Sequence, residues 1–251
     1  MATIKAIKQI LQQSTDEKAA APFRQDGRRG VQAELRKFDR KLRQEQQYQE
    51  LWQEMTRYER DLRDYCSIAG IDEVGRGPLA GGVTAAAVIL PNEAYLPGLN
   101  DSKKIPKLKR EQLFEDILAC ASVGVGSCTP KEIDTYNIYE ASKIAMVRAL
   151  ERLPVQPDYL LIDAMELPVS INQKNLTKGD TKSVSIAAAS IVAKVTRDRE
   201  MAELDRIYPG YGFQANAGYG TSEHLQALDR LGPTPYHRQS FAPVRNRNRL
   251  S

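Results

Sequence analysis

Cysteine and histidine are scarce in this chain, and their scarcity argues against several kinds of site. The 251 residues include three cysteines, Cys66, Cys120 and Cys128, and none of them forms a Cys-x-x-Cys spacing. An odd number of widely spaced thiols argues against a disulfide framework or a zinc site and is typical of a reducing cytosol. The two histidines, His224 and His237, are isolated in the sequence. We expect each to be a hydrogen-bonding structural residue rather than a metal ligand or a base.

Long apolar runs are also missing. No segment reaches the roughly 18 apolar residues that a membrane-spanning helix requires, and no signal-peptide pattern opens the chain. We therefore expect a cytoplasmic protein, a monomer, with no membrane partner. The net charge is +4 and the pI is near 8.9, which permits a nucleic-acid partner without demanding one.

The composition changes near residue 66, which predicts a helical N-terminal extension, residues 1–66, and a main domain, residues 67–251. Isoleucines at positions 4, 7 and 10 predict a short amphipathic helix, and a long helix is expected over residues 31–65. Two functions stay open for the extension, which either packs on the main domain or binds a nucleic acid. The second is supported only by 14 Lys and Arg against 11 Asp and Glu in residues 1–65.

From residue 67 onward the pattern is that of an α/β fold, in which short apolar runs alternate with helical periodicity. The first two apolar runs are separated by a glycine-rich turn and predict a hairpin. Helices are expected before residue 120, over 137–153 and after Asp180, and strands are expected at 67–73, 82–90, 121–129, 159–163 and 167–172.

Four carboxylates stand where acidic residues are unusual. Asp72 and Glu73 end one apolar run, Asp163 ends another, and Asp180 opens a helix. Each alone could be a helix cap or a turn residue. Together they suggest one site, because ligands gather at strand ends in α/β sheets. Clustered carboxylates repel one another unless a cation lies between them, and oxygen-only ligation selects Mg²⁺ or Mn²⁺.

One geometric condition follows from the adjacency of Asp72 and Glu73. Neighbouring residues of a regular strand point to opposite faces, so both side chains reach one site only if the strand ends or bulges there. The glycines at 75 and 77 favour such a break.

Five motifs in order resemble bacterial ribonuclease HII: "GIDEVGRGPLAGG", "LNDSKK", "LLIDAM", "KGDTKSVSIAAASIVAKVTRDR" and "GYGTSEHLQAL…GPTPYHRQSF". The match spans about residues 68–244, and the N-terminal extension resembles that of some Gram-positive members more loosely. The resemblance implies an RNase H-like fold, with a mixed sheet flanked by helices. It implies cleavage of RNA in RNA–DNA hybrids and cleavage at ribonucleotides in duplex DNA, by two-metal-ion catalysis that leaves 3′-hydroxyl and 5′-phosphate ends.

The resemblance also assigns residues. The metal-binding acids of the family fall on Asp72, Glu73, Asp163 and Asp180, and recognition of the ribose 2′-hydroxyl falls on Gly75, Arg76, Gly77 and Tyr219. The chain departs from many members at Gly82, Asn216 and Ala217, and the last two departures could weaken a phosphate contact. Affinity for a nucleic acid further requires basic residues along its backbone. The candidates for these contacts are Lys103, Lys104, Lys182, Lys194, Arg197 and Arg238.

Other functions compete with this one. Ribonuclease HIII is a near alternative, but it typically carries Gly-Lys-Gly where this chain has Arg76 between glycines. A non-catalytic nucleic-acid-binding module would use the acids as caps and would bind no divalent ion. A resolvase or integrase would share the metal chemistry without the Gly-Arg-Gly motif. A nucleotide-binding protein is disfavoured because no complete phosphate-binding loop is present.

Overall fold

A computed structural model describes residues 2–248 of the chain, which divides into two compact units, Met1–Glu54 and Met55–Ser251. The N-terminal unit contains α1 (Ile4–Gln13), two short 3₁₀ turns, η1 (Glu17–Ala19) and η2 (Ala21–Phe23), and nearly all of α2 (Arg29–Met55). The expected long helix is interrupted, because α2 ends at Met55 and the separate α3 covers Arg57–Asp61.

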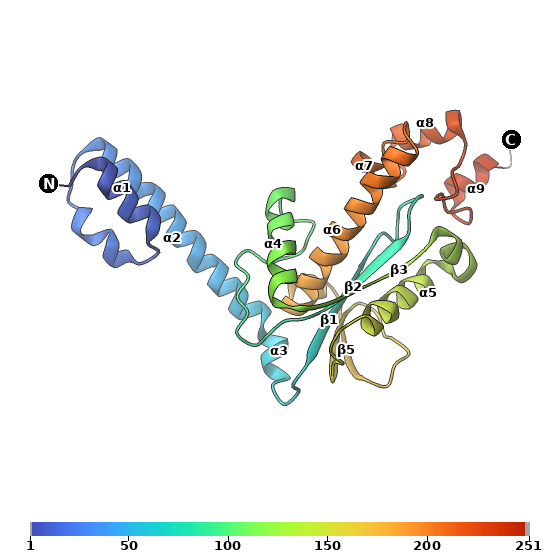
Figure 1. Ribbon diagram of the computed structural model, residues 1–251, viewed down its shortest axis with the longest axis horizontal. Helices are drawn as coiled ribbons and strands as arrows, with labels where there is room; N and C mark the ends of the chain where they lie inside the picture. The colour runs from blue at the N-terminus through green and yellow to red at the C-terminus, as the bar shows by residue number, and fades with distance from the viewer. Residues whose placement is uncertain (1, 249–251) are drawn as a thin grey trace. The chain divides into compact units, whose positions relative to one another are not determined.

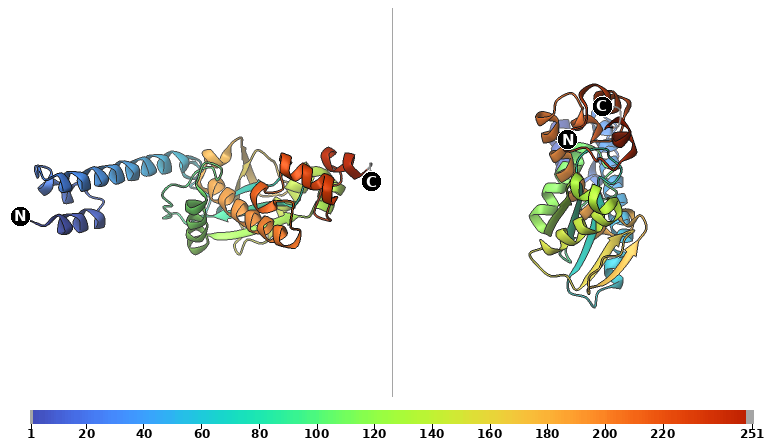
Figure 2. Two further views of the ribbon diagram at one scale, coloured as in Figure 1. Left: turned by 90° about the horizontal axis from the view of Figure 1, so that it is seen from above. Right: turned by 90° about the vertical axis from the view of Figure 1, so that its right-hand side faces the viewer.

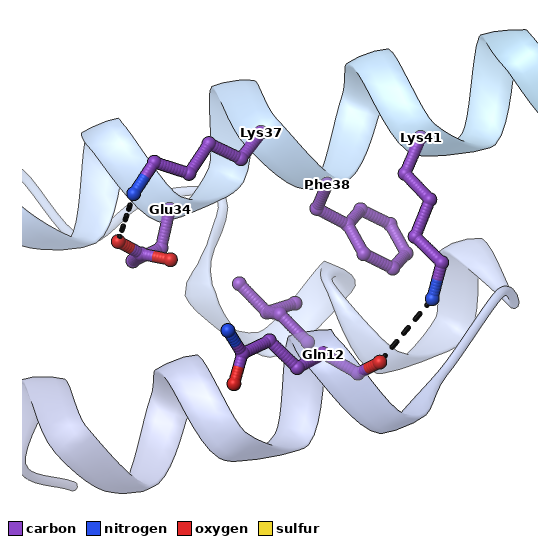
Figure 3. Close-up of a pocket in the computed structure, with 6 residues that line it drawn as sticks. Gln12, Glu34, Lys37, Phe38 and Lys41 are labelled. Carbon is purple, nitrogen blue, oxygen red and sulfur yellow. Dashed lines mark hydrogen bonds and ion pairs between the residues drawn. The ribbon is translucent and has the colours of Figure 1, made fainter. Parts of the chain in front are cut away.

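A small apolar core joins the two helices of the N-terminal unit. Ile7 and Leu11 of α1 are buried against Val31, Leu35 and Phe38 of α2. Their spacing of three, four and seven residues places each set on one helical face. Polar contacts flank this core: the ammonium of Lys41 donates to the carbonyl of Gln12 at 3.2 Å (Figure 3).

The second unit is built on a five-stranded mixed sheet in the order β3-β2-β1-β4-β5. The antiparallel half pairs β1 with β2 and β2 with β3, and the parallel half pairs β1 with β4 and β4 with β5. The predicted hairpin and the mixed sheet are thus confirmed. The strands are β1 (Ile68–Val74), β2 (Val83–Ile89), β3 (Ser122–Cys128), β4 (Tyr159–Asp163) and β5 (Asn172–Leu176).

One strand lies elsewhere than expected. The run at 167–172 was predicted as a strand, but β5 begins at Asn172. The side-chain amide of Gln173 bonds both the N–H and the carbonyl of Leu167, which holds the preceding residues in a turn. Because β5 is polar and mostly exposed, it lacks the apolar alternation that sequence patterns detect.

Helices cover both faces of the sheet (Figures 1 and 2). On one face lies α5 (Pro130–Glu151), which packs on β1, β2 and β3 and is kinked at Asn137. On the other lies α6 (Val184–Ile207), and α4 (Lys107–Cys120) packs against α6. The close approach of α6 depends on Gly70 of β1, since a Cβ there would collide with the backbone of Ser185.

Three short helices follow within the described residues: α7 (Phe213–Asn216), α8 (Ser222–Leu231) and α9 (Ala242–Asn248). They share an apolar cluster with the end of α6, centred on the fully buried Phe213. Within residues 2–248, no helix is both long and apolar enough to span a bilayer.

Candidate active site

Two of the predicted acids meet at the carboxyl ends of adjacent parallel strands. The last paired residues of β1 and β4 are Ile71 and Ile162, so the residues that follow them, Asp72 and Asp163, lie at the same level of the sheet. Strand order therefore brings together two carboxylates that are 91 positions apart in sequence. Asp72 is buried, with 7% of its surface exposed.

We expected β1 to end or bulge at Asp72 and Glu73, and the structure shows neither. The register of β1 with β2 continues without a bulge to Val74. Instead, the pairing of β1 with β4 stops after Ile71, and the sheet opens on that side alone. The N–H of Glu73 donates to the Asp72 carboxylate at 2.7 Å. Both acidic side chains nevertheless lie close to Asp163, whose charge contributes to the raised pKa of each.

Asp180 joins this edge through the turn that precedes α6. It lies in the 3₁₀ turn η3 (Gly179–Thr181), and the N–H of Gly179 donates to Asp163 Oδ1 at 2.7 Å. The N-cap of α6 is Ser183, whose hydroxyl accepts from the N–H of Ile186. Asp180 therefore does not cap α6, so a role as the N-cap of this helix does not explain its position.

Burial and nearby acids disfavour the charged forms of Asp72 and Glu73. Burial raises the pKa of Asp72 well above its ordinary value, and the neighbouring Glu73 and Asp163 raise it further. Burial also raises the pKa of Glu73 to about 7, although Arg76 and Lys103 oppose the shift. Such clustering of perturbed carboxyl groups is typical of functional sites.

Sequence reasoning missed one acid at this site. Burial raises the pKa of Asp180, and the next cause is Asp101, ahead of Asp163. Asp101 lies in the loop before α4 and shares the surroundings of Asp180 with Lys103. The motif "LNDSKK" contains this acid next to the two lysines that were predicted to contact a nucleic acid.

The carboxylate oxygens at this site suit a hard divalent cation, although the described side chains do not surround one as they stand. No group of three or more His, Cys, Asp or Glu within residues 2–248 is arranged to hold an ion as the side chains stand. Glu73 fits such an ion, because its Oε2 is buried and has no hydrogen-bond partner. A buried carboxylate oxygen without a partner is costly, and Mg²⁺ and Mn²⁺ prefer carboxylate oxygen ligands.

The glycine–arginine–glycine loop follows β1 directly and lies beside Tyr219. Gly75 has a φ of 94°, which favours glycine, and a Cβ there would collide with the Arg197 guanidinium. A Cβ on Gly77 would stand 3.3 Å from Cε1 of Tyr219. The Tyr219 side chain is exposed, and Arg76 Nη1 lies 3.8 Å from Glu73 Oε1. The loop predicted to read the sugar thus lies beside Tyr219, and its arginine lies close to Glu73.

The structure corrects two of the six predicted nucleic-acid contacts. Arg197 and Arg238 are fully buried and donate to backbone carbonyls, so neither can reach a phosphate. Lys194 is partly exposed and forms an ion pair with Asp198 at 2.6 Å, and its contact with a nucleic acid stays a prediction. The sequence does not show whether a basic residue faces solvent or a buried loop. Lys103, Lys104 and Lys182 are exposed and stay predictions.

Comparison with known proteins decides the family. A family model described as Ribonuclease HII matches residues 69–244, and one described as Ribonuclease HII N-terminal domain matches residues 3–63. The chain belongs to the ribonuclease HII family. It is therefore a metal-dependent endonuclease that hydrolyses phosphodiester bonds. The two models flank the predicted domain boundary at residue 66, whereas the compact units divide at Glu54, so that boundary stays a prediction.

Relatives match over nearly the full length of the chain. A ribonuclease HII of Geobacillus sp. (strain WCH70) is 54% identical over 97% of this chain and 90% of its own length. One of Enterococcus faecalis is 50% identical over 97% of this chain and 98% of its own. The crystal structure of ribonuclease H2 from Pyrococcus horikoshii OT3 has a TM-score of 0.64 at 26% identity, covering 73% of this chain and 98% of that one. The RNase H-like fold and the recognition of a ribonuclease HII with an N-terminal extension are confirmed.

Proposed function

We propose that this ribonuclease HII cleaves the RNA strand of RNA–DNA hybrids and also cuts duplex DNA on the 5′ side of an embedded ribonucleotide. The products would be 3′-hydroxyl and 5′-phosphate ends. The observation that carries the proposal is the meeting of Asp72, Glu73 and Asp163 where the sheet opens between β1 and β4, beside Asp180. An open edge lined by carboxylates is suited to a phosphodiester that is bound through cations.

The four acids would hold Mg²⁺ or Mn²⁺, and a ribonuclease HIII of the same fold has been crystallised with Mn²⁺. When bound, two such ions lower the pKa of an attacking water and stabilise the departing 3′-oxygen. The chain itself contributes position. Asp72 and Asp163 are held at one level by the sheet, and the Gly179 N–H keeps the Asp163 carboxylate oriented toward the η3 turn.

Specificity for ribose would arise between the Gly75–Gly77 loop and Tyr219. The 2′-hydroxyl is the group that distinguishes RNA from DNA at a single sugar. Glycine at position 77 leaves the backbone open to an approaching sugar edge, and the Tyr219 ring stands beside it. Arg76, which is partly exposed and lies near Glu73, is placed to bind a phosphate oxygen next to the cut.

Further affinity would come from basic residues with no base readout. In the second unit these are Lys103, Lys104 and Lys182. In the N-terminal unit, four exposed arginines recur at steps of seven, four and three along α2, on the side of the helix opposite Val31, Leu35 and Phe38. We propose that this basic stripe also contacts the substrate backbone; it consists of Arg29, Arg36, Arg40 and Arg43.

The test is to incubate the protein with duplex DNA that carries one ribonucleotide, with Mg²⁺ or Mn²⁺ present, and to map the cut. Cleavage immediately 5′ of the ribonucleotide is expected. Cleavage confined to longer RNA tracts would overturn the proposed specificity and favour a ribonuclease HIII-like activity.

Asp72→Asn provides the matched control for the chemistry. We expect turnover to be lost while hybrid binding is largely retained, because the substitution removes a charge from the metal site and leaves the shape of β1 unchanged. A fully active Asp72→Asn protein would show that the acids are not the metal ligands. Titration of the wild type with Mn²⁺ should detect binding, and its absence would favour a non-catalytic module.

A further inference from the structure

A short segment near the C-terminus, Thr234–Arg238, donates to the Gly75–Gly77 loop directly and is linked to Tyr219 through His224. Its residue His237 forms an isolated β-bridge with Ala80, just after the glycine loop. Adjacent residues of an extended segment point in opposite directions, so His237 and Arg238 face different partners. His237 contacts His224, which in turn contacts Tyr219, whereas Arg238 donates to the loop Gly75–Gly77.

The histidine side of the segment is a hydrogen-bonded chain that ends on Tyr219. The N–H of Thr234 donates to His237 Nδ1 at 2.9 Å, so the proton of a neutral His237 is on Nε2. His237 Nε2 lies 3.0 Å from His224 Nε2, which must then accept. The remaining proton of His224 is on Nδ1 and is donated to the carbonyl of Tyr219 at 2.8 Å. Each ring nitrogen has one role, and the direction of the chain is set by the N–H of Thr234.

The surroundings keep both rings neutral and in place. His224 and His237 are at most 1% exposed, and the Tyr211 and Phe213 rings pack against them with centroids 5.1 to 6.3 Å away. Burial lowers the pKa of His237 to about 4, and it lowers the pKa of His224 as well. The two histidines are therefore not isolated, and their pairing could not be seen in the sequence.

The arginine side of the segment holds the loop. The guanidinium of Arg238 is fully buried and spans the loop from its first glycine to the turn before β2. Its donors are satisfied by backbone oxygens at 2.5 to 3.1 Å, namely those of Gly75, Arg76, Gly81 and Gly82. A fork of donors against several carbonyls fixes the loop in one conformation.

We propose that His237 and Arg238 are positioning residues that set the gap between the Tyr219 ring and the Gly75–Gly77 loop, and that His224 transmits this position to Tyr219. The inference rests on the proposed recognition of the 2′-hydroxyl in that gap. A sugar placed correctly between loop and ring puts its phosphate in line with the acids, so the effect falls on turnover. Affinity changes little, because Arg76 is one of several basic residues proposed to contact the nucleic-acid backbone.

The test compares two substitutions of the histidine that touches Tyr219. His224→Asn retains an N–H donor near the position of Nδ1, whereas His224→Leu has a similar volume and no donor. Both lose the acceptor for His237, so both share that structural defect. On duplex DNA with one ribonucleotide, we expect His224→Leu to lose at least tenfold in kcat with Kd within threefold, and His224→Asn to recover most of the loss. Equal losses in both variants would overturn the inference.

A double-mutant cycle with Tyr219→Ala separates this inference from the proposed function. If His224 acts through Tyr219, His224→Leu should cause no further loss of kcat in the Tyr219→Ala background. Additive losses would overturn the positioning role alone. If instead Tyr219→Ala cuts the single-ribonucleotide duplex as fast as the wild type, then the proposed role of Tyr219 fails first.

Discussion

Neutralising Glu73 should stabilise the metal-free protein while impairing the enzyme. The Glu73 side chain is 11% exposed, and burial raises its pKa from 4.5 to about 7. Between pH 4.5 and about 7, the folded state therefore holds a proton on Glu73 that the unfolded state has largely released. It follows that the free energy of unfolding falls as pH rises through this window. At pH 8 the ionised carboxylate costs the folded state about 3 kcal/mol.

Glu73→Gln removes this cost because the amide does not titrate. In EDTA, urea unfolding should show the variant more stable than the wild type by about 3 kcal/mol at pH 8 and nearly equal to it at pH 4. Saturating Mg²⁺ should stabilise the wild type more than the variant, since the cation offsets the same repulsion. Equal stability of the two proteins at pH 8 in EDTA, or a gain that does not depend on pH, would refute the reasoning.

An acid with the opposite environment supplies the control. The Arg148 guanidinium and the Thr129 N–H lower the pKa of Glu132 to about 2, so its charge stabilises the folded state above the ordinary pKa. Glu132→Gln should therefore destabilise the protein at pH 8. Because the Arg148 side chain is 37% exposed, we expect a screened effect of about 1 kcal/mol. The two glutamine variants thus shift stability in opposite directions.

Three further predictions follow from the described contacts. Gly77→Ala should fold normally but lose roughly tenfold in kcat/KM on the single-ribonucleotide duplex, because a methyl group would stand 3.3 Å from Cε1 of Tyr219, where the sugar must enter; unchanged kinetics would place the sugar elsewhere. Arg36→Gln combined with Arg40→Gln should lower the slope of log affinity against log salt by about two, measured by hybrid binding, whereas an unchanged slope would remove the basic stripe from the interface. Because the folded-state pKa of His237 is about 4 against the usual 6.5, the stability that the neutral ring contributes is complete above pH 6.5 and falls by about 3 kcal/mol as pH drops to 4. In urea unfolding, the difference in free energy of unfolding between the wild type and His237→Asn should shrink by that amount over the same pH range.

Local features of the sequence predicted much of the fold. Strands β1 to β4 are apolar runs bounded by turns, and their pattern is visible in any window of a few residues. The position of β5 was predicted wrongly, because this polar edge strand has no apolar pattern of its own and is defined by its pairing with β4.

The surroundings of basic and acidic residues could not be predicted in the same way. Arg238 reads as an exposed cation in "YHRQSF", yet it is buried because four loop carbonyls far away in sequence converge on it. Asp101 reads as part of a basic loop, yet it lies close enough to Asp180 to affect its pKa. Long-range packing decides both environments.

The residues that we expect to carry the chemistry can be chosen from the sequence alone, since acids at the ends of apolar runs and a glycine-flanked arginine are local features. The way in which Asp72 and Glu73 share an edge depends on the fold. The parallel pairing of β1 with β4 ends at Ile71 while the antiparallel pairing with β2 continues to Val74. That one-sided opening, rather than the expected bulge, accompanies the convergence of both acids on Asp163. It could not be predicted, because strand pairing depends on residues that are far apart in the chain.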